Sequence, residues 1–351
     1  MLTYMLIFGA ALALALGGTP LARRLALSTG VVDKPSERKV HRTVVPLLGG
    51  VAIYGASVAA LLVFGDRFYV AQSVSILVGA SLVSFLGVWD DRSGVRPLLK
   101  LGGQVVAALI PVISGVRVEI LRDPWLNSAL TVFWIVAITN SLNLLDNMDG
   151  LSSGVAAVAA AFFFLLAVWN GQFLVATLAA ALLGACLGFL YYNFNPAKIF
   201  MGDSGSLFLG YALAALGIKL RFENTDIVTW MIPVLVLGLA IFDTALVVVS
   251  RARRGLNPFT TPGRDHVSHR LVTLGWTQRE AVMFLYLVCG MLGMVSLFLM
   301  KATILEGYVV AGVVLLVALV MLVRLERIPL GGGQRPQLQE PVQPEVQLGE
   351  R

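Results

Sequence analysis

The stretch "ALTVFWIVAITNSLNLLDNMDGLSSGVAAVAAAFFFLLAVW", residues 129–169, places a polar segment between two long apolar runs. The polar segment carries Asn140, Asn143, Asp146, Asn147 and Asp149. A helix needs roughly 20 apolar residues to cross the hydrocarbon of a bilayer, and each flanking run approaches that length. The pattern therefore predicts two membrane-spanning helices, joined by a polar segment at one membrane surface.

The composition of the whole chain indicates the same class of protein. Of its 351 residues, 58% are hydrophobic and 13% are charged, and the mean hydropathy is +0.84. Soluble globular proteins are about 45–50% apolar and about 25% charged. No basic domain with interleaved aromatic residues is present, which argues against a nucleic-acid partner. Cys186 and Cys289 lie far apart within apolar runs, and we interpret them as buried apolar residues.

We predict an all-α fold, a polytopic integral membrane bundle of about eleven transmembrane helices in one domain over residues 1–328. The expected spans are 3–21, 45–64, 69–88, 98–116, 125–143, 151–169, 172–191, 205–220, 227–249, 280–300 and 304–323. Arg23 and Arg24 follow the first span, which is the wrong polarity for a cleaved signal peptide. Residues 329–351, rich in Pro, Gln and Glu, are expected to be a disordered cytoplasmic tail.

The positive-inside rule orients this bundle. With eleven spans, 20 of the 26 Lys and Arg residues fall on one side of the membrane and six on the other. The side rich in Lys and Arg is predicted to be cytoplasmic. It also receives polar residues from four separate spans or loops: Asp90, Asp91, Asp146, Asp149, Asp203, His266 and His269. We therefore expect one shared cytoplasmic cleft.

The residue types in this cleft indicate phosphoryl transfer. Carboxylates without cysteine suit Mg²⁺ or Mn²⁺, which usually binds one or two carboxylates together with phosphate oxygens of the substrate. The glycines of "MGDSGS", residues 201–206, let backbone N–H groups approach an anion at a helix start. Basic residues complete the predicted anion site: Arg38, Lys39, His41, Arg42, Arg264 and Arg270. Phosphoryl transfer is catalysed mainly by positioning and charge neutralisation.

Each segment taken alone has an ordinary structural explanation. The "DD" of Asp90 and Asp91 is typical of a solvated helix cap, "DNMDG" of an N-cap and turn, and "MGDSG" of a loop between helices. Asp243 lies inside a span, where a hydrogen bond to a neighbouring helix is a more common role than catalysis. A zinc site would need more ligands than the three histidines of this chain readily supply. The functional interpretation depends on several segments meeting at one surface.

Several long motifs in one order resemble a known family. "RKVHRTVVPLLGG" (38–50), the "DD" pair, "NSLNLLDNMDGL" (140–151), "NFNPAKIFMGDSGS" (193–206) and "GRDHVSHRL" (263–271) are similar to those of the polyprenyl-phosphate N-acetylhexosamine-1-phosphate transferases. The resemblance covers about residues 20–325. It implies that a polyprenyl (undecaprenyl or decaprenyl) phosphate attacks the β-phosphate of a UDP-linked amino sugar in a Mg²⁺-dependent reaction. UMP is released, as a first membrane step of a bacterial cell-envelope glycan.

The resemblance also implies residue roles. Asp203 matches the magnesium ligand, Asn143 and Asp146 lie near metal and diphosphate, and Asp149 lies at the uridine end. Asn193 and Phe200 match positions that line the nucleotide pocket in the family, where the ring of Phe200 would stack on uracil. The catalytic residues are expected to be Asp90, Asp91, Asp146, His266 and His269. The substrate-binding residues are expected to be Lys39, His41, Lys100, Asn143, Asp149, Asn193, Phe200 and Arg264, and the metal ligands Asp203 and Asn143.

One position departs from the family pattern. Many relatives read His-x-His-His in the last motif, whereas the middle position here is Ser268. This favours a GlcNAc-1-phosphate transferase over the alternative, the UDP-MurNAc-pentapeptide translocase of peptidoglycan synthesis. CDP-alcohol phosphotransferases and secondary transporters are the competing classes. In the CDP-alcohol phosphotransferases, the motif continues from Asp-Gly to an Ala-Arg pair that this sequence lacks. Secondary transporters place their acidic residues near the midplane of the membrane, whereas here these residues cluster at one surface. Relatives form homodimers, but no residue pattern in this chain indicates an interface.

Overall fold

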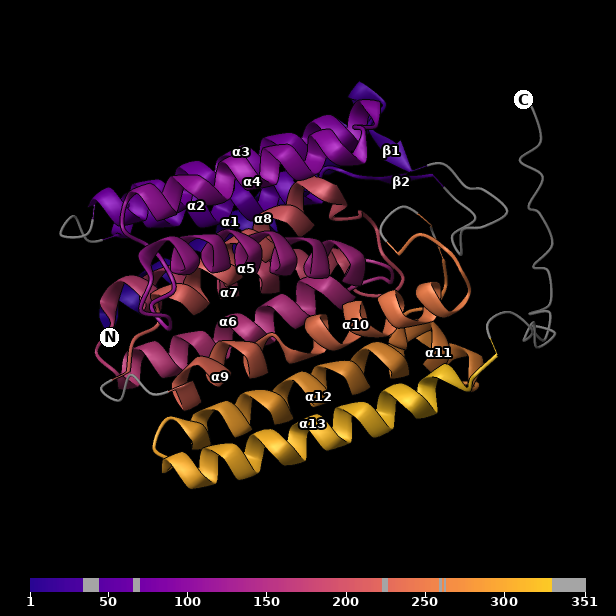
Figure 1. The fold of residues 1–351 in the computed structure, drawn as a ribbon. Helices are drawn as coiled ribbons and strands as arrows, with labels where there is room; N and C mark the ends of the chain where they lie inside the picture. Colours follow the sequence, from indigo (N-terminus) through magenta and orange to yellow (C-terminus); the bar gives the residue numbers. More distant parts are fainter. Residues whose placement is uncertain (34–43, 66–69, 223–226, 259–260, 262, 330–351) are drawn as a thin grey trace, which may run out of the picture.

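Most helices of this chain run along one common direction and form a single bundle (Figure 1). The computed structural model describes residues 1–33, 44–65, 70–222, 227–258, 261 and 263–329. The helices are α1 (Leu2–Thr29), α2 (Gly49–Phe64), α3 (Val70–Ser93), α4 (Pro97–Ile113), α5 (Pro124–Leu145), α6 (Leu151–Trp169), α7 (Phe173–Asn193), α8 (Gly202–Lys219), α9 (Ile227–Val236), α10 (Gly238–Arg253), α11 (Val267–Thr273), α12 (Gln278–Leu299) and α13 (Ile304–Glu326). Two short strands, β1 (Val32–Asp33) and β2 (Val45–Pro46), pair antiparallel. The predicted all-α, polytopic membrane class is confirmed.

The predicted count of eleven spans is wrong. Seven described helices are long and apolar enough to cross a membrane, or eight if the bent pair α9 and α10 is one span. The other predicted segments are helices too, but α2 and α4 have only 16 and 17 residues. At about 1.5 Å per residue they fall short of a hydrocarbon core about 30 Å thick. Helix α8 has 18 residues, with Asp203 in its first turn and Lys219 at its end, and it is not among the candidate spans.

The segment predicted as one span over 227–249 is bent. Helices α9 and α10 meet at an angle of 71°. Pro233 lies inside α9, and α10 begins at Gly238. Proline removes a backbone donor and crowds the preceding turn, so it is a common cause of such a bend. The bend aims α10 toward the end of the bundle that carries α11 (Figure 1).

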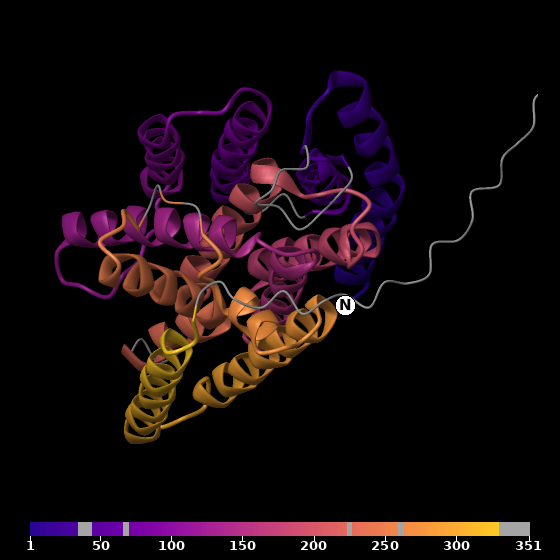
Figure 2. The ribbon, with the colours of Figure 1, turned by 90° about the vertical axis from the view of Figure 1, so that its right-hand side faces the viewer.

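The core of the bundle is built from α6, α7 and α8, whose residues are mostly buried. Helix α1 packs closely along α7, where Gly188 would place a Cβ only 2.7 Å from the backbone oxygen of Leu12. Helix α13 lies at the edge of the bundle (Figure 2), and only Gly307 and Leu325 of it are buried. An apolar helix with so little protein contact is suited to a lipid environment.

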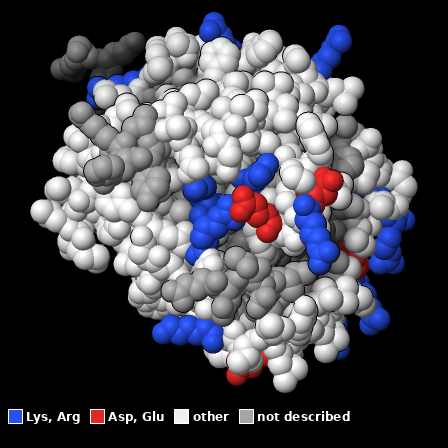
Figure 3. All heavy atoms as spheres, turned by 60° about the vertical axis from the view of Figure 1, so that its left-hand side comes forward, with Lys and Arg blue, Asp and Glu red and all other residues white. Residues whose placement is uncertain are grey.

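The two ends of the bundle differ. One end carries β1, β2 and α11, together with the loops that precede α6 and α8 (Figure 1). At the opposite end, which Figure 3 brings forward, Lys and Arg side chains lie next to acidic ones near the centre of the view. Glu119, in the segment between α4 and α5, pairs with Arg221 at 3.3 Å and with Arg117 at 3.9 Å. The acidic motifs singled out in the sequence fall at the first end.

Candidate active site

The carboxylate of Asp203 is the point at which residues of four helices meet. It contacts Nζ of Lys100 from α4, and it accepts a hydrogen bond from Nδ2 of Asn143 from α5 at 2.8 Å. The same Nδ2 lies 2.9 Å from Oγ of Ser206, one turn further along α8. Lys100 Nζ also pairs with Oδ2 of Asp90 from α3 at 2.9 Å. The two predicted metal ligands, Asp203 and Asn143, are therefore in direct contact.

Asp91 uses both of its carboxylate oxygens to cap α8. Oδ1 accepts the backbone N–H of Asp203 at 2.8 Å, and Oδ2 accepts that of Ser204 at 3.1 Å. The preceding Gly202 has a φ of +71°, and a Cβ there would lie 2.6 Å from Oδ2 of Asp91. A carboxylate at a helix start satisfies free N–H groups and is favoured by the helix dipole. The predicted acidic pair is thus divided: Asp91 is held by α8, and Asp90 faces Lys100.

Because Asp91 acts as a cap, its two neutral variants should differ in stability. Asp91→Asn keeps a side-chain oxygen that can accept an N–H, and Asp91→Ala keeps none. We expect Asp91→Ala to unfold with a free energy about 1 kcal/mol lower than Asp91→Asn. Thermal unfolding of the purified variants in one detergent measures this, with Asp90→Asn as the control for a lost charge at the same site. Equal stability of Asp91→Asn and Asp91→Ala would contradict the capping role.

The carboxylate of Asp146 has no bonding partner within the described part of the chain. It follows the last residue of α5, and only its backbone N–H is bonded, to the backbone oxygen of Asn143. Burial raises the pKa of the Asp146 carboxyl well above its usual range, and the negative charges of Asp203, Asp91 and Asp149 raise it further. Such a carboxyl gains stability from a cation placed beside it.

Two predicted nucleotide-binding residues, Asp149 and Asn193, hold neighbouring loops together. Asp149 Oδ2 accepts the side-chain N–H of Asn195 at 3.0 Å and the backbone N–H of Ala197 at 2.9 Å. Asn193 Oδ1 accepts the N–H of Gly150 at 3.1 Å, and its Nδ2 donates to the backbone oxygen of Ile199 at 3.0 Å. Asn193 is only 3% exposed. These bonds join the segment before α6 to the segment before α8.

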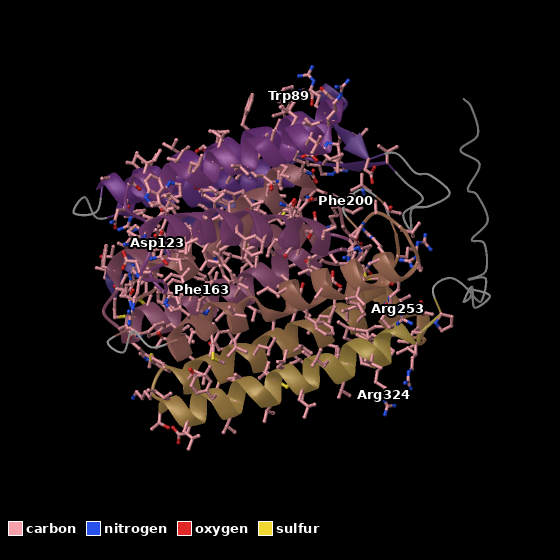
Figure 4. All side chains as sticks on the ribbon, in the orientation of Figure 1. Trp89, Asp123, Phe163, Phe200, Arg253 and Arg324 are labelled. Atoms are coloured by element: carbon pink, nitrogen blue, oxygen red, sulfur yellow. The ribbon has the colours of Figure 1, made fainter. Side chains whose placement is uncertain are left out.

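Phe200 lies at the same end of the bundle as Trp89, Arg253 and Arg324, as the labels of Figure 4 show. Its backbone is fixed on both sides by the segment that starts at β2. The N–H of Phe200 donates to Pro46 at 2.8 Å, and its carbonyl oxygen accepts the N–H of Gly49 at 3.0 Å. The ring is half-buried. Phe200 directly precedes Met201 and the start of α8, whose first turn contains Asp203.

The loop that contains the two predicted histidines joins the site through Asp243 and Asn147. His266 Nδ1 lies 2.7 Å from Asp243 Oδ2, and both side chains are buried. The hydroxyl of Ser268 donates to Oδ1 of Asn147 at 2.6 Å, next to Asp146. Burial, followed by the positive charges of neighbouring groups, lowers the pKa of His269 to about 4, so this ring is neutral at pH 7. No role was assigned to Asn147 from the sequence. It lies between Asp146 and Asp149, and the functional roles in this part of the motif were assigned to those two carboxylates.

An arginine and aspartate network holds this loop in place. The carboxylate of Asp265 accepts hydrogen bonds from Nε and Nη2 of Arg251 at 2.9 and 3.0 Å. It accepts a third from Nη2 of Arg254 at 2.6 Å. Arg270, expected to belong to an anion site, is 1% exposed and bonded within the protein. Its Nε donates to the backbone oxygen of Asp265 at 3.0 Å, and Nη2 pairs with Glu326 at 2.5 Å. The prediction for Arg270 is therefore wrong, because its donors are used to hold α11 against α13. Arg264 is exposed.

The remaining predicted anion-binding residues, Arg38, Lys39, His41 and Arg42, lie outside the residues that the structure describes. In the part that it does describe, no three Asp, Glu, His or Cys side chains converge as a complete metal site. Mg²⁺ does not need one, since it commonly takes one or two carboxylates and completes its shell with water and substrate phosphate. The side-chain oxygens of Asp203 and Asn143, which lie in contact, fit that requirement. Asp146, whose carboxylate has no bonding partner among the described residues, is a further candidate.

One family model and three relatives show which known proteins this chain is similar to. Residues 73–221 match the model of the "Glycosyl transferase family 4". The chain is 36% identical over 297 residues to a Bacillus subtilis protein, the "Probable undecaprenyl-phosphate N-acetylglucosaminyl 1-phosphate transferase", with 82% of each chain covered. It is 32% identical over 360 residues to the "Decaprenyl-phosphate N-acetylglucosaminephosphotransferase" of Mycolicibacterium smegmatis, covering 91% of this chain and 87% of that one. A Salmonella typhimurium "Undecaprenyl-phosphate alpha-N-acetylglucosaminyl 1-phosphate transferase" is 28% identical over 286 residues, covering 78% and 77%.

Proposed function

Because this chain belongs to glycosyl transferase family 4, we propose that it transfers GlcNAc-1-phosphate from UDP-GlcNAc to a polyprenyl phosphate in the membrane. The observation that carries the proposal is the meeting of Asp203, Asp90, Lys100 and Asn143, which come from four different helices. This site adjoins the segments before α6 and α8, which the hydrogen bonds of Asp149 and Asn193 join, and Phe200 lies in the second of these segments. A transporter would not need such a convergence at one end of its bundle.

In the proposed reaction, an oxygen of the lipid phosphate forms a bond to the β-phosphorus of the UDP-sugar. The bond from that phosphorus to the bridging oxygen breaks, and UMP leaves. We assign the proton acceptor for the lipid phosphate to Asp90. Its Oδ1 accepts the N–H of Val95 and its Oδ2 pairs with Lys100 of the site, whereas both oxygens of Asp91 are bonded to the start of α8. That phosphate has a second pKa near 6, so the base has only a modest task. We favour this direct attack over an aspartyl intermediate.

We propose Mg²⁺ as the cofactor, with Mn²⁺ as a substitute. Asp203 and Asn143 would hold it, with Asp146 close by. When bound, the ion offsets the repulsion between two anionic substrates. Lys100 adds a fixed positive charge, and its contacts with Asp90 and Asp203 keep the two carboxylates together before substrate arrives. Asp149 and Phe200 would orient the uridine, and the loop with His266, His269 and Arg264 would face the diphosphate and the sugar.

The assay uses sealed membrane vesicles of both orientations, supplied with radiolabelled UDP-GlcNAc and undecaprenyl phosphate. We expect butanol-soluble label and an equal amount of UMP from inverted vesicles, and no label from right-side-out vesicles until detergent is added. EDTA should stop the reaction, and Mg²⁺ should restore it. UDP-MurNAc-pentapeptide serves as the second donor. The proposal would be overturned by lipid label from UDP-MurNAc-pentapeptide alone, by release of CMP from a CDP-alcohol, or by uptake of the UDP-sugar without release of UMP. Activity in intact right-side-out vesicles would reverse the predicted orientation of the site.

A further inference from the structure

Asp243 is a buried carboxyl group that the reaction as described above does not use. It lies on α10, and it is 0% exposed. Removing a carboxylate from water costs several kcal/mol unless partners compensate, so its partners indicate its purpose. Both of its oxygens are bonded to the start of α11: Oδ2 to Nδ1 of His266 at 2.7 Å, and Oδ1 to the N–H of Val267 at 2.8 Å. Each is a good hydrogen-bond distance.

The two contacts fix both the position and the tautomer of His266. An ionised carboxylate only accepts hydrogen bonds, so the neutral ring must carry its proton on Nδ1. Nε2 then has a free lone pair, and it bonds to no other residue in the described segments. The bond from Val267 prevents the carboxylate from turning away from the ring. A histidine held in this way accepts a proton at Nε2, and the adjacent carboxylate stabilises the resulting cation.

The histidine loop also touches the acidic site directly. Ser268 Oγ donates to Asn147, the residue after Asp146, at 2.6 Å. The ring of His269 is 6.1 Å from that of His266 between centroids, and its pKa of about 4 leaves it uncharged. Asp265, which follows Arg264 in the chain, is bound to Arg251 and Arg254. Of the acidic groups that the structure describes around His266, Asp243 is therefore the one that bonds to its ring.

We propose that Asp243 is a positioning residue for catalysis, which holds His266 in the Nδ1–H tautomer with Nε2 presented to the substrate phosphates. This role rests on the proposed function, but its structural part does not depend on any substrate. The order in the chain conceals the pair, because 23 residues separate Asp243 from His266. The chain between α10 and α11 folds back and brings the two side chains together.

The first test observes the tautomer directly. The chain has three histidines, so solid-state NMR of ¹⁵N-histidine-labelled protein in lipid gives three ring systems. The variants His266→Gln and His269→Gln assign them. At pH 8 we expect His266 to carry its proton on Nδ1 in the wild type, and to shift toward the Nε2–H form in Asp243→Asn. A wild-type His266 with its proton on Nε2 would overturn the proposal, whatever the enzyme activity.

The second test separates positioning from folding. We expect Asp243→Asn to lower kcat about 10²-fold, with the KM for UDP-GlcNAc changed less than about 3-fold. If Asp243 acts through His266, the double variant Asp243→Asn/His266→Ala should be no slower than His266→Ala alone. Fully multiplicative losses would overturn the proposal, and so would a normal kcat for Asp243→Asn. The matched control is Thr244→Val, because the buried hydroxyl of Thr244 has no partner among the described residues.

These readouts distinguish two failures. If wild-type vesicles transfer no sugar phosphate from any UDP-sugar, the proposed function is wrong, and the tautomer measurement still decides the pairing of Asp243 with His266. If Asp243→Asn does not fold, the wild-type spectrum decides the proposal alone. A normal transfer rate together with an Nε2–H ring would keep the proposed function and remove the positioning role of Asp243.

Discussion

Replacing Asp203 with alanine is expected to abolish transfer of GlcNAc-1-phosphate, with a loss of at least about 10³-fold in kcat. The carboxylate is contacted by Lys100 and Asn143, and the variant removes the group on which both converge. It also removes the strongest candidate ligand for Mg²⁺, so the residual activity should no longer rise with added Mg²⁺. Asp203→Asn should be nearly as inactive, because it keeps the shape and removes the charge.

The measurement is label transfer at a series of Mg²⁺ concentrations, with expression and thermal unfolding followed in parallel. Asp123→Asn is the matched control, since Asp123 caps α5 at the opposite end of the bundle (Figure 4), where it accepts the N–H of Trp125 at 2.7 Å. That variant should fold slightly less stably and transfer normally. Ordinary, Mg²⁺-dependent activity of Asp203→Ala would remove Asp203 from the metal site.

Gly87→Ala is expected to lower kcat about 10²-fold, although it adds a single methyl group. Gly87 lies on α3, where a Cβ would overlap backbone atoms of Asp203 and Ser204 at the start of α8. Backbone atoms cannot rotate away as a side chain does, so α3 and α8 must separate. A displacement of about 1 Å is enough to cost about 10² in rate when the reacting groups depend on it. Overpacking should also lower the free energy of unfolding by about 1–3 kcal/mol.

Gly102→Ala provides the matched control for this variant. Gly102 lies on α4, two residues after Lys100, and a Cβ there meets nothing within 4 Å. Because alanine is the better helix former, this change should leave transfer unchanged and stabilise the helix by up to about 1 kcal/mol. Thermal unfolding and label transfer compare the pair. Wild-type kcat in Gly87→Ala would show that the contact between α3 and α8 does not position Asp203.

The sequence alone predicted the class of the fold, and it predicted that the acidic motifs lie at the same end of the bundle. Runs of apolar residues indicate helices, because the hydrocarbon core leaves a single chain few other ways to satisfy its backbone. Gathering Asp90, Asp146 and Asp203 at one end needed only the order of the spans. It did not predict how many of those helices are long enough to cross. Length depends on where each helix starts and stops, and the bend at Pro233 depends on the packing around α9 and α10.

The tertiary structure decided what each polar side chain does. In the sequence, Asp90 and Asp91 are equivalent neighbours, yet one faces Lys100 and the other caps α8, 112 residues away. Arg270 was predicted to bind an anion, but it pairs with Glu326 at the end of α13. Asp243 lies beside His266 and bonds to its ring. A hydrogen bond needs its two groups within about 3 Å in a set direction. Hydropathy is a property of each residue, whereas such a distance is a property of two chain segments, and only folding brings those segments together.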